Sequence, residues 1–129
     1  MIYTYSDNVP KSTPALSKRR TIMTLCRGIV HKVEVQFPVG CSEVAKCTIN
    51  DALHQVWPSN GGAFFASDGH VISFEESYEI LTRPYVLDLW CWNDSTEFPH
   101  NITVNIGILP KKSMVHYIIP EAINMILRK

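Results

Sequence analysis

The sequence lacks three features that would each point to a broad functional class. It has no run of about 18 apolar residues, so it offers no membrane-spanning helix. Twelve basic and twelve acidic residues cancel, so a nucleic acid is not expected as the main partner. Residues 1–7 show no positive charge followed by an apolar stretch, and therefore predict no secretory signal. We expect a soluble protein that binds neither membranes nor nucleic acids.

Motifs for catalysis and cofactor binding are also missing. The sequence contains no Gly-x-Ser-x-Gly elbow, no glycine-rich phosphate loop and no dinucleotide fingerprint. It contains no His-Glu-x-x-His motif and no calcium loop, and the spacing of Cys41 and Cys47 fits no zinc pattern. We therefore predict a protein that is not an enzyme, with no catalytic residue, no metal and no cofactor.

The four cysteines do not define a disulfide framework, because no secretory signal accompanies them. Reduced thiols are the default, although the oxidised state stays open. Cys47 and Cys91 are in phase with the apolar faces of their segments, and this predicts small buried side chains rather than metal ligands.

Apolar and polar residues alternate in several short segments, which is the pattern of half-buried strands. The clearest is 101–109, where isoleucines and a valine stand at every second position. In 29–37, Ile29, Val33, Val35 and Phe37 share one face. The predicted strands are 21–26, 29–37, 44–50, 53–57, 71–74, 78–81, 85–92 and 101–109.

Short strands separated by turn signals at 58–62 and 67–69 are typical of an antiparallel β-sandwich or jelly roll. Parallel architecture is excluded because no segment is free to form crossover helices. We predict a single all-β domain over residues 1–129. An extended arm covers 1–20, the sandwich covers 21–110, and an extension covers 111–129. Tyr3 and Tyr5 share one side of an extended chain, so a short edge strand at the start is an alternative.

The extension is predicted to carry a short C-terminal α-helix over 120–128. Pro120 suits a first helical position, and Arg128 and Lys129 suit a last turn. A helix this short is marginal alone, so its apolar side must dock on its own sandwich or on another subunit. That side carries Ile119, Ile123, Ile126 and Leu127.

Three tryptophans are the leading candidates for a binding surface. Trp90 and Trp92 stand opposite Leu87 and Leu89 in their segment, and Trp57 precedes a turn. If the leucines face the core, the tryptophans form an interface or a ligand platform. The alternative is a strand covered on both faces. We favour coverage for Trp90 and an interface for Trp57 and Trp92.

Polar residues near these tryptophans are candidates for hydrogen bonding to a glycan. His54, Asn60 and Asp68 stand in or beside the predicted turns. With His70, they contain groups adequate for a metal site or proton relay, but their spacing is not diagnostic. Turn-forming and solvent-facing roles are the commoner outcome for such residues.

Residues 20–110 resemble small uncharacterised β-sandwich proteins encoded by viruses of archaea and bacteria. The similarity is carried by 28–41 (GIVHKVEVQFPVGC), 53–60 (LHQVWPSN), 65–68 (FASD), 72–74 (ISF), 92–94 (WND) and 100–110, which begins HNITV. The resemblance implies a viral setting, with the protein in a virion or in the host cytoplasm. It brings no activity and no catalytic residues.

Two functional hypotheses follow. The first is a non-enzymatic viral structural or assembly protein that forms homo-oligomers, or binds other virion proteins, through its arm, its tryptophan face and its helix. The second is a carbohydrate-binding or other ligand-binding module that uses the tryptophans.

Overall fold

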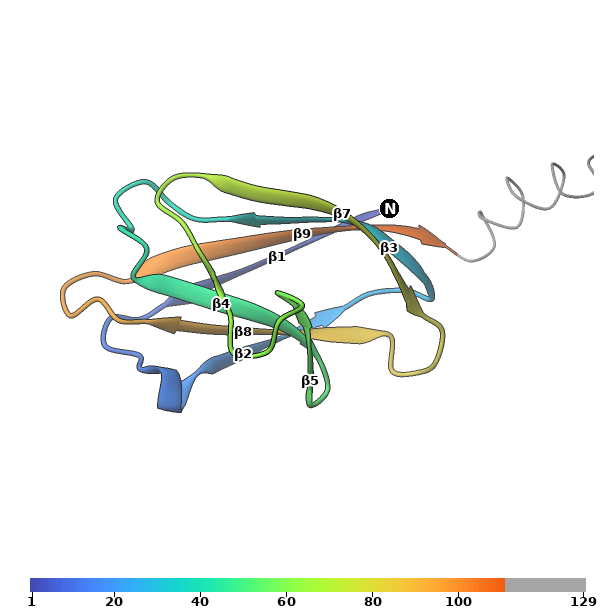
Figure 1. Ribbon diagram of the computed structural model, residues 1–129, viewed down its shortest axis with the longest axis horizontal. Coiled ribbons are helices and arrows are strands. Elements are labelled where there is room, and N and C mark those ends of the chain that lie inside the picture. Colours follow the sequence, from blue (N-terminus) through green and yellow to red (C-terminus); the bar gives the residue numbers. More distant parts are fainter. Residues whose placement is uncertain (111–129) are drawn as a thin grey trace, which may run out of the picture.

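Nine β-strands and one short 3-10 helix follow one another in residues 1–110, the part of the chain that the computed structural model describes (Figure 1). All strand pairs are antiparallel, which confirms the predicted all-β class. The predicted helix over 120–128 lies outside the described residues. The elements are β1 (Ile2–Val9), η1 (Ala15–Ser17), β2 (Arg19–Thr24), β3 (Gly28–Gln36), β4 (Ala45–Asp51), β5 (His54–Trp57), β6 (Phe65–Ala66), β7 (Val71–Ile80), β8 (Val86–Asn93) and β9 (His100–Pro110).

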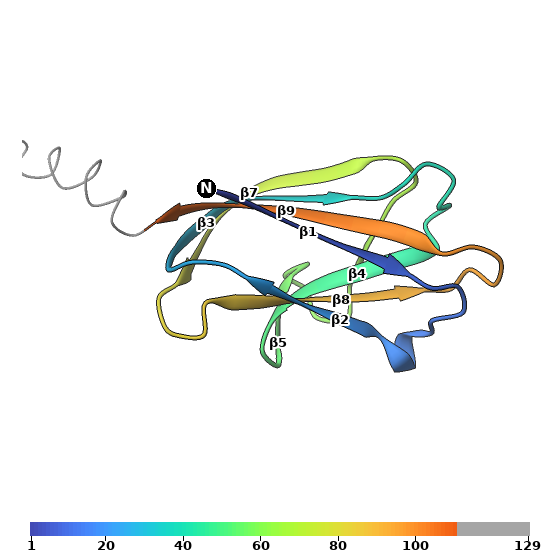
Figure 2. The ribbon, with the colours of Figure 1, turned by 180° about the vertical axis from the view of Figure 1, so that it is seen from behind.

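The strands form two sheets that pack face to face as a sandwich (Figures 1 and 2). One sheet has the order β1-β9-β3-β7, and the other has the order β2-β8-β4-β5, with β6 paired to β4. The chain changes sheet at most of its connections, so strands distant in sequence lie side by side. The start of β1 therefore lies beside the end of β9.

The core lies between the sheets and follows the period-two pattern of the strands. Four alternate residues of β9 and three of β8 point into it and are at most 1% exposed. This confirms the inward faces predicted for 101–109 and for the leucines of 85–92. The residues are Ile102, Val104, Ile106, Ile108, Leu87, Leu89 and Cys91.

A β-bulge at His31 changes the face that β3 presents to the core. The pairing register with β9 shifts between Val30 and Lys32, so one extra residue stands on β3. An extra residue reverses the alternation on either side of it. Val30 therefore joins the core cluster with Val33 and Val35, whereas the sequence pattern assigned Ile29 to that face.

Two predicted boundaries differ from the structure. The sandwich begins at Ile2 rather than at residue 21, because β1 pairs with β9 over its full length. The segment predicted as an extended arm thus contains an edge strand, which is the alternative that Tyr3 and Tyr5 indicated. The predicted strands 71–74 and 78–81 form one strand, β7, in which Glu75 still pairs with Lys32 of β3 and Glu76 lies in the register shift before Tyr78.

Candidate functional site

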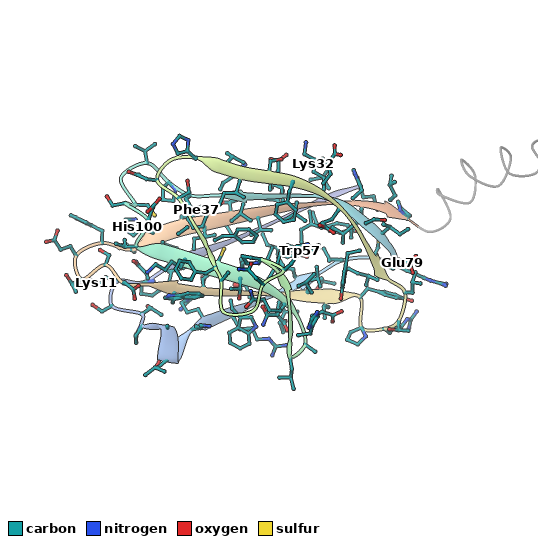
Figure 3. The ribbon with its side chains drawn as sticks, viewed as in Figure 1. Lys11, Lys32, Phe37, Trp57, Glu79 and His100 are labelled. Atoms are coloured by element: carbon teal, nitrogen blue, oxygen red, sulfur yellow. The ribbon has the colours of Figure 1, made fainter. Side chains whose placement is uncertain are left out.

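Trp57 lies in the core rather than on a surface. Its side chain is 3% exposed, and its ring centroid lies 5.8 Å from that of Phe74 and 5.5 Å from that of Tyr78. Both partners belong to β7 in the facing sheet, so Trp57 fills space between the two layers (Figure 3). The prediction of an interface role for Trp57, which required exposure, is therefore wrong.

Trp92 is covered on the outer side of its sheet by two loops. The ring of Phe64 meets it edge to face at 5.6 Å, and the Lys18 Nζ lies 4.5 Å from its centroid. Phe64 precedes β6 and Lys18 follows η1, so these contacts come from distant parts of the chain. Trp92 is 6% exposed, and the prediction of an open face at this residue is wrong.

Trp90 is half-buried on the same outer face. The Arg20 guanidinium lies 5.9 Å from its ring centroid. The buried Nε1 of Trp90 and the buried Oδ1 of Asn50 have no hydrogen-bond partner among the described residues. Such groups in native proteins generally bind water or a ligand.

The polar candidates stand on three different turns. His54 is exposed at the start of β5, opposite Asp51, and Asn60 is exposed in the loop after Pro58. Asp68 accepts a hydrogen bond of 2.8 Å from the backbone N–H of Gly40, which links two loops that are distant in sequence. Within residues 1–110 no three His, Cys, Asp or Glu side chains gather in a way that could hold a metal ion.

A polar cleft of about 260 Å³ opens at one end of the sandwich, between the β4–β5 turn and the β7–β8 loop. On its wall, Arg20 forms an ion pair with the buried Asp88, with Nε–Oδ1 and Nη2–Oδ2 distances of 3.0 and 3.2 Å. This cleft can hold a polar ligand. The only sequence signal for it was the carboxylate of Asp88 in an otherwise apolar strand. Its charged lining residues are Arg20, Asp51, Glu79, Arg83 and Asp88.

Next to the cleft, the Tyr78 hydroxyl donates a hydrogen bond of 2.6 Å to Asp51 Oδ2. Burial raises the pKa of Tyr78 to about 12, and the hydrogen bond to the Asp51 carboxylate adds to this effect. The phenol is therefore a neutral donor that fixes one cleft carboxylate.

The four outer edges of the two sheets differ in how they are protected against pairing with another strand. Exposed charged side chains protect an edge, as does a short strand length. The β7 edge carries Glu75, Glu76 and Glu79, the β2 edge carries two arginines, and β5 has only four residues. By contrast, β1 has eight residues, and its exposed side chains are uncharged: Ile2, Thr4, Ser6 and Asn8.

The first residue pair between β1 and β9 shows which backbone N–H and C=O groups of β1 point to its free edge. Met1 and Ile108 exchange two hydrogen bonds, with N–O distances of 2.9 and 2.7 Å. In an antiparallel ladder such pairs alternate with pairs whose N–H and C=O groups point away from the neighbour. The groups that point to the free edge of β1 therefore belong to Ile2, Thr4, Ser6 and Asn8.

The remaining predicted interface residues, Ile119, Ile123, Ile126 and Leu127, lie outside the described residues. Within residues 1–110 no helix is long and apolar enough to cross a membrane.

Among solved structures, the chain is similar to a crystal structure of PirA. The similarity covers 81% of this chain and 94% of that chain, with 14% sequence identity and a TM-score of 0.35. No protein-family model matches the sequence, and no curated protein matches it either.

Proposed function

We propose that the protein is a non-enzymatic structural or assembly protein that forms homo-oligomers through the free edge of β1. The observation that carries this proposal is the contrast among the sheet edges. The β1 edge is long, regularly paired on its inner side and without exposed charge, while β7, the opposite edge of the same sheet, carries three glutamates. A regular edge without exposed charge is a template for adding a strand.

Two copies can pair along β1 about a twofold axis. In the register centred on Tyr5, Thr4 of one copy stands opposite Ser6 of the other, and Ile2 stands opposite Asn8. All four residues direct their N–H and C=O groups to the edge, so the ladder is continuous. Such an interface uses the same surface in both copies, as twofold dimers do.

The strand order also favours an assembly role. With the two-residue β6 set aside, β1-β9-β3-β7 and β2-β8-β4-β5 have the order of an eight-stranded jelly roll. Viral capsid and lectin domains use this architecture, although fold alone does not determine function. The resemblance of residues 20–110 to small viral proteins points the same way. We propose a virion or host-cytoplasm location, with other virion proteins as further partners.

The test uses one substitution on two edges of the same sheet. Ser6→Lys places an ammonium group at the centre of the β1 edge, and Ser73→Lys places it on β7 as the matched control. Light scattering after size-exclusion chromatography should show oligomers for the full-length chain and for Ser73→Lys, and monomers for Ser6→Lys. A monomeric full-length chain at high concentration would overturn the proposal, as would a Ser6→Lys variant that still oligomerises.

A second candidate function is binding of a glycan or similar polyol in the end cleft. The paired carboxylate of Asp88 and the guanidinium of Arg83 suit hydroxyl-rich ligands, and Trp90 stands beside Arg20. A glycan array should then show binding that Arg83→Ala removes and that Arg27→Ala, a change at another arginine, preserves. Absence of binding to the array, or equal binding by both variants, would count against this candidate.

A further inference from the structure

Two cysteines stand directly opposite each other on neighbouring strands of the second sheet. Cys47 of β4 pairs with Cys91 of β8 in the antiparallel register. Both side chains point to the core face and both residues are 0% exposed. The sequence placed these residues in phase with their apolar faces but gave no indication that they face each other.

The hydrogen bonding next to the pair determines its geometry. The backbone N–H of Asp94 donates to the carbonyl of Val44 at 3.0 Å, so these two residues form a hydrogen-bonded pair. Alternation along the ladder then makes Cys47 and Cys91 a non-hydrogen-bonded pair. In such pairs the Cα atoms are about 4.5 Å apart and the side chains are at their closest. That separation lies within the range of about 4.4–6.8 Å found across disulfides.

We propose that Cys47 and Cys91 are a redox-responsive dithiol, which a low-molecular-weight disulfide converts to a cross-strand disulfide. One thiolate attacks the oxidant to form a mixed disulfide and releases a thiol. The second thiolate then attacks the Sγ of the first cysteine and releases the second thiol. The two cysteines lose two protons and two electrons, and the oxidant is reduced to two thiols.

Burial makes this conversion depend on opening of the sandwich. Desolvation raises the pKa of the Cys47 thiol well above its usual value, and a hydrogen bond with Cys91 acts in the same direction. Since the thiolate is the attacking species, exchange is slow in the folded protein. The same burial protects a disulfide, once formed, from reductants. The redox state of the Cys47–Cys91 pair is therefore determined when the chain folds or when the sandwich opens.

The other cysteines provide an internal comparison. Cys41 is also 0% exposed, but its thiol donates to the carbonyl of Ser67 at 3.3 Å rather than facing a second cysteine. Cys26 is half-buried, and its Sγ lies 3.9 Å from the sulfur of Met1. Neither has a cysteine opposite it in the described strand pairs.

The experiment refolds the full-length chain in a buffer of oxidised and reduced glutathione, blocks free thiols with N-ethylmaleimide in denaturing urea and identifies linked peptides by mass spectrometry. We expect the Cys47 and Cys91 peptides to be joined and Cys26 and Cys41 to be alkylated. Cys41→Ala should leave this linkage intact, whereas Cys91→Ala should leave Cys47 alkylated. Alkylation of all four cysteines after refolding, or linkage of Cys47 to another cysteine, would overturn the proposal.

A rate measurement tests the role of burial and does not need a variant that folds. Native reduced protein and protein in a denaturing concentration of urea are exposed to the same oxidised glutathione. Loss of the free thiols of Cys47 and Cys91 should be slower in the native protein by roughly a hundredfold or more, because it requires local opening. Equal rates of loss in the two samples would contradict the proposal.

Discussion

Asp7 and Arg19 form a bidentate ion pair that joins the two sheets at one side of the sandwich. Arg19 donates from Nε to Oδ2 at 2.9 Å and from Nη2 to Oδ1 at 3.0 Å. Asp7 lies on the edge strand β1 and Arg19 begins β2, so the pair connects the free edge to the facing sheet. The Asp7 side chain is only 10% exposed, and hydrogen bonding to its carboxylate raises the pKa of Arg19.

We predict that Arg19→Ala lowers the free energy of unfolding by about 2 kcal/mol, because it leaves a buried carboxylate without its partner. The control is Lys32→Ala, which breaks an exposed pair at 3.9 Å from Glu34 and should cost less than about 0.5 kcal/mol. Urea unfolding at neutral pH measures both. Equal effects of the two substitutions would show that the Asp7 pair does not stabilise the fold.

Asn93 organises the turn between β8 and β9 from a fully buried position. Its Nδ2 donates to the carbonyls of Val9 and Phe98 at 3.2 and 3.0 Å, and its Oδ1 accepts from Ser95 N–H at 3.0 Å. Asn93→Ala removes all three bonds, and we expect a loss of about 2–3 kcal/mol in thermal or urea unfolding. The exposed Asn60→Ala should change stability by less than about 0.5 kcal/mol.

Gly28 is required by the close approach of β3 and β9. A Cβ at this position would overlap the backbone carbonyl oxygen of Leu109, which cannot move without distorting the ladder. We predict that Gly28→Ala destabilises the protein by about 1–3 kcal/mol. Gly61→Ala is the control, since a Cβ added at Gly61 would meet no atom within 4 Å. A melting temperature for Gly28→Ala equal to that of Gly61→Ala would contradict this prediction.

The raised pKa of Tyr78 predicts a loss of stability in alkali. The pKa is about 12 in the folded protein and about 10 in an unfolded chain, so folding favours the neutral phenol. The contribution of the neutral Tyr78 phenol to the free energy of unfolding is complete below about pH 10 and is lost as the pH rises through about 12. Tyr78→Phe should reduce the fall in unfolding free energy between about pH 9 and about pH 11.5. An unchanged slope would show that Tyr78 does not titrate in this way.

The parts of the fold that could be predicted from the sequence are those decided by local alternation. In β9, Ile102 and Ile106 face the core, and the residues between them point to the other side of the sheet. The alternation of apolar and polar residues therefore predicted both the strand and its inward face. The same reasoning assigned the wrong residue, Ile29, to the core face of β3. The bulge at His31 adds one residue, and an added residue reverses the alternation of faces on either side of it.

The candidate site could not be predicted because it depends on contacts between distant segments. Trp92 is buried because Lys18 and Phe64 fold over it, and nothing in its own strand indicates this. The edge position of β1 depends on its pairing with β9, which lies at the far end of the described chain. Local patterns carry no information about such partners.

The proximity of Met1 to Ile108 has a consequence for how an assembly could grow. In a twofold pair joined along β1, the two strands run in opposite directions, so the two Pro110 residues stand at opposite poles of the pair. Pairing consumes the β1 edge of both copies, and lateral growth along that edge therefore stops at two. Any longer filament or shell would have to be extended through surfaces other than the β1 edge.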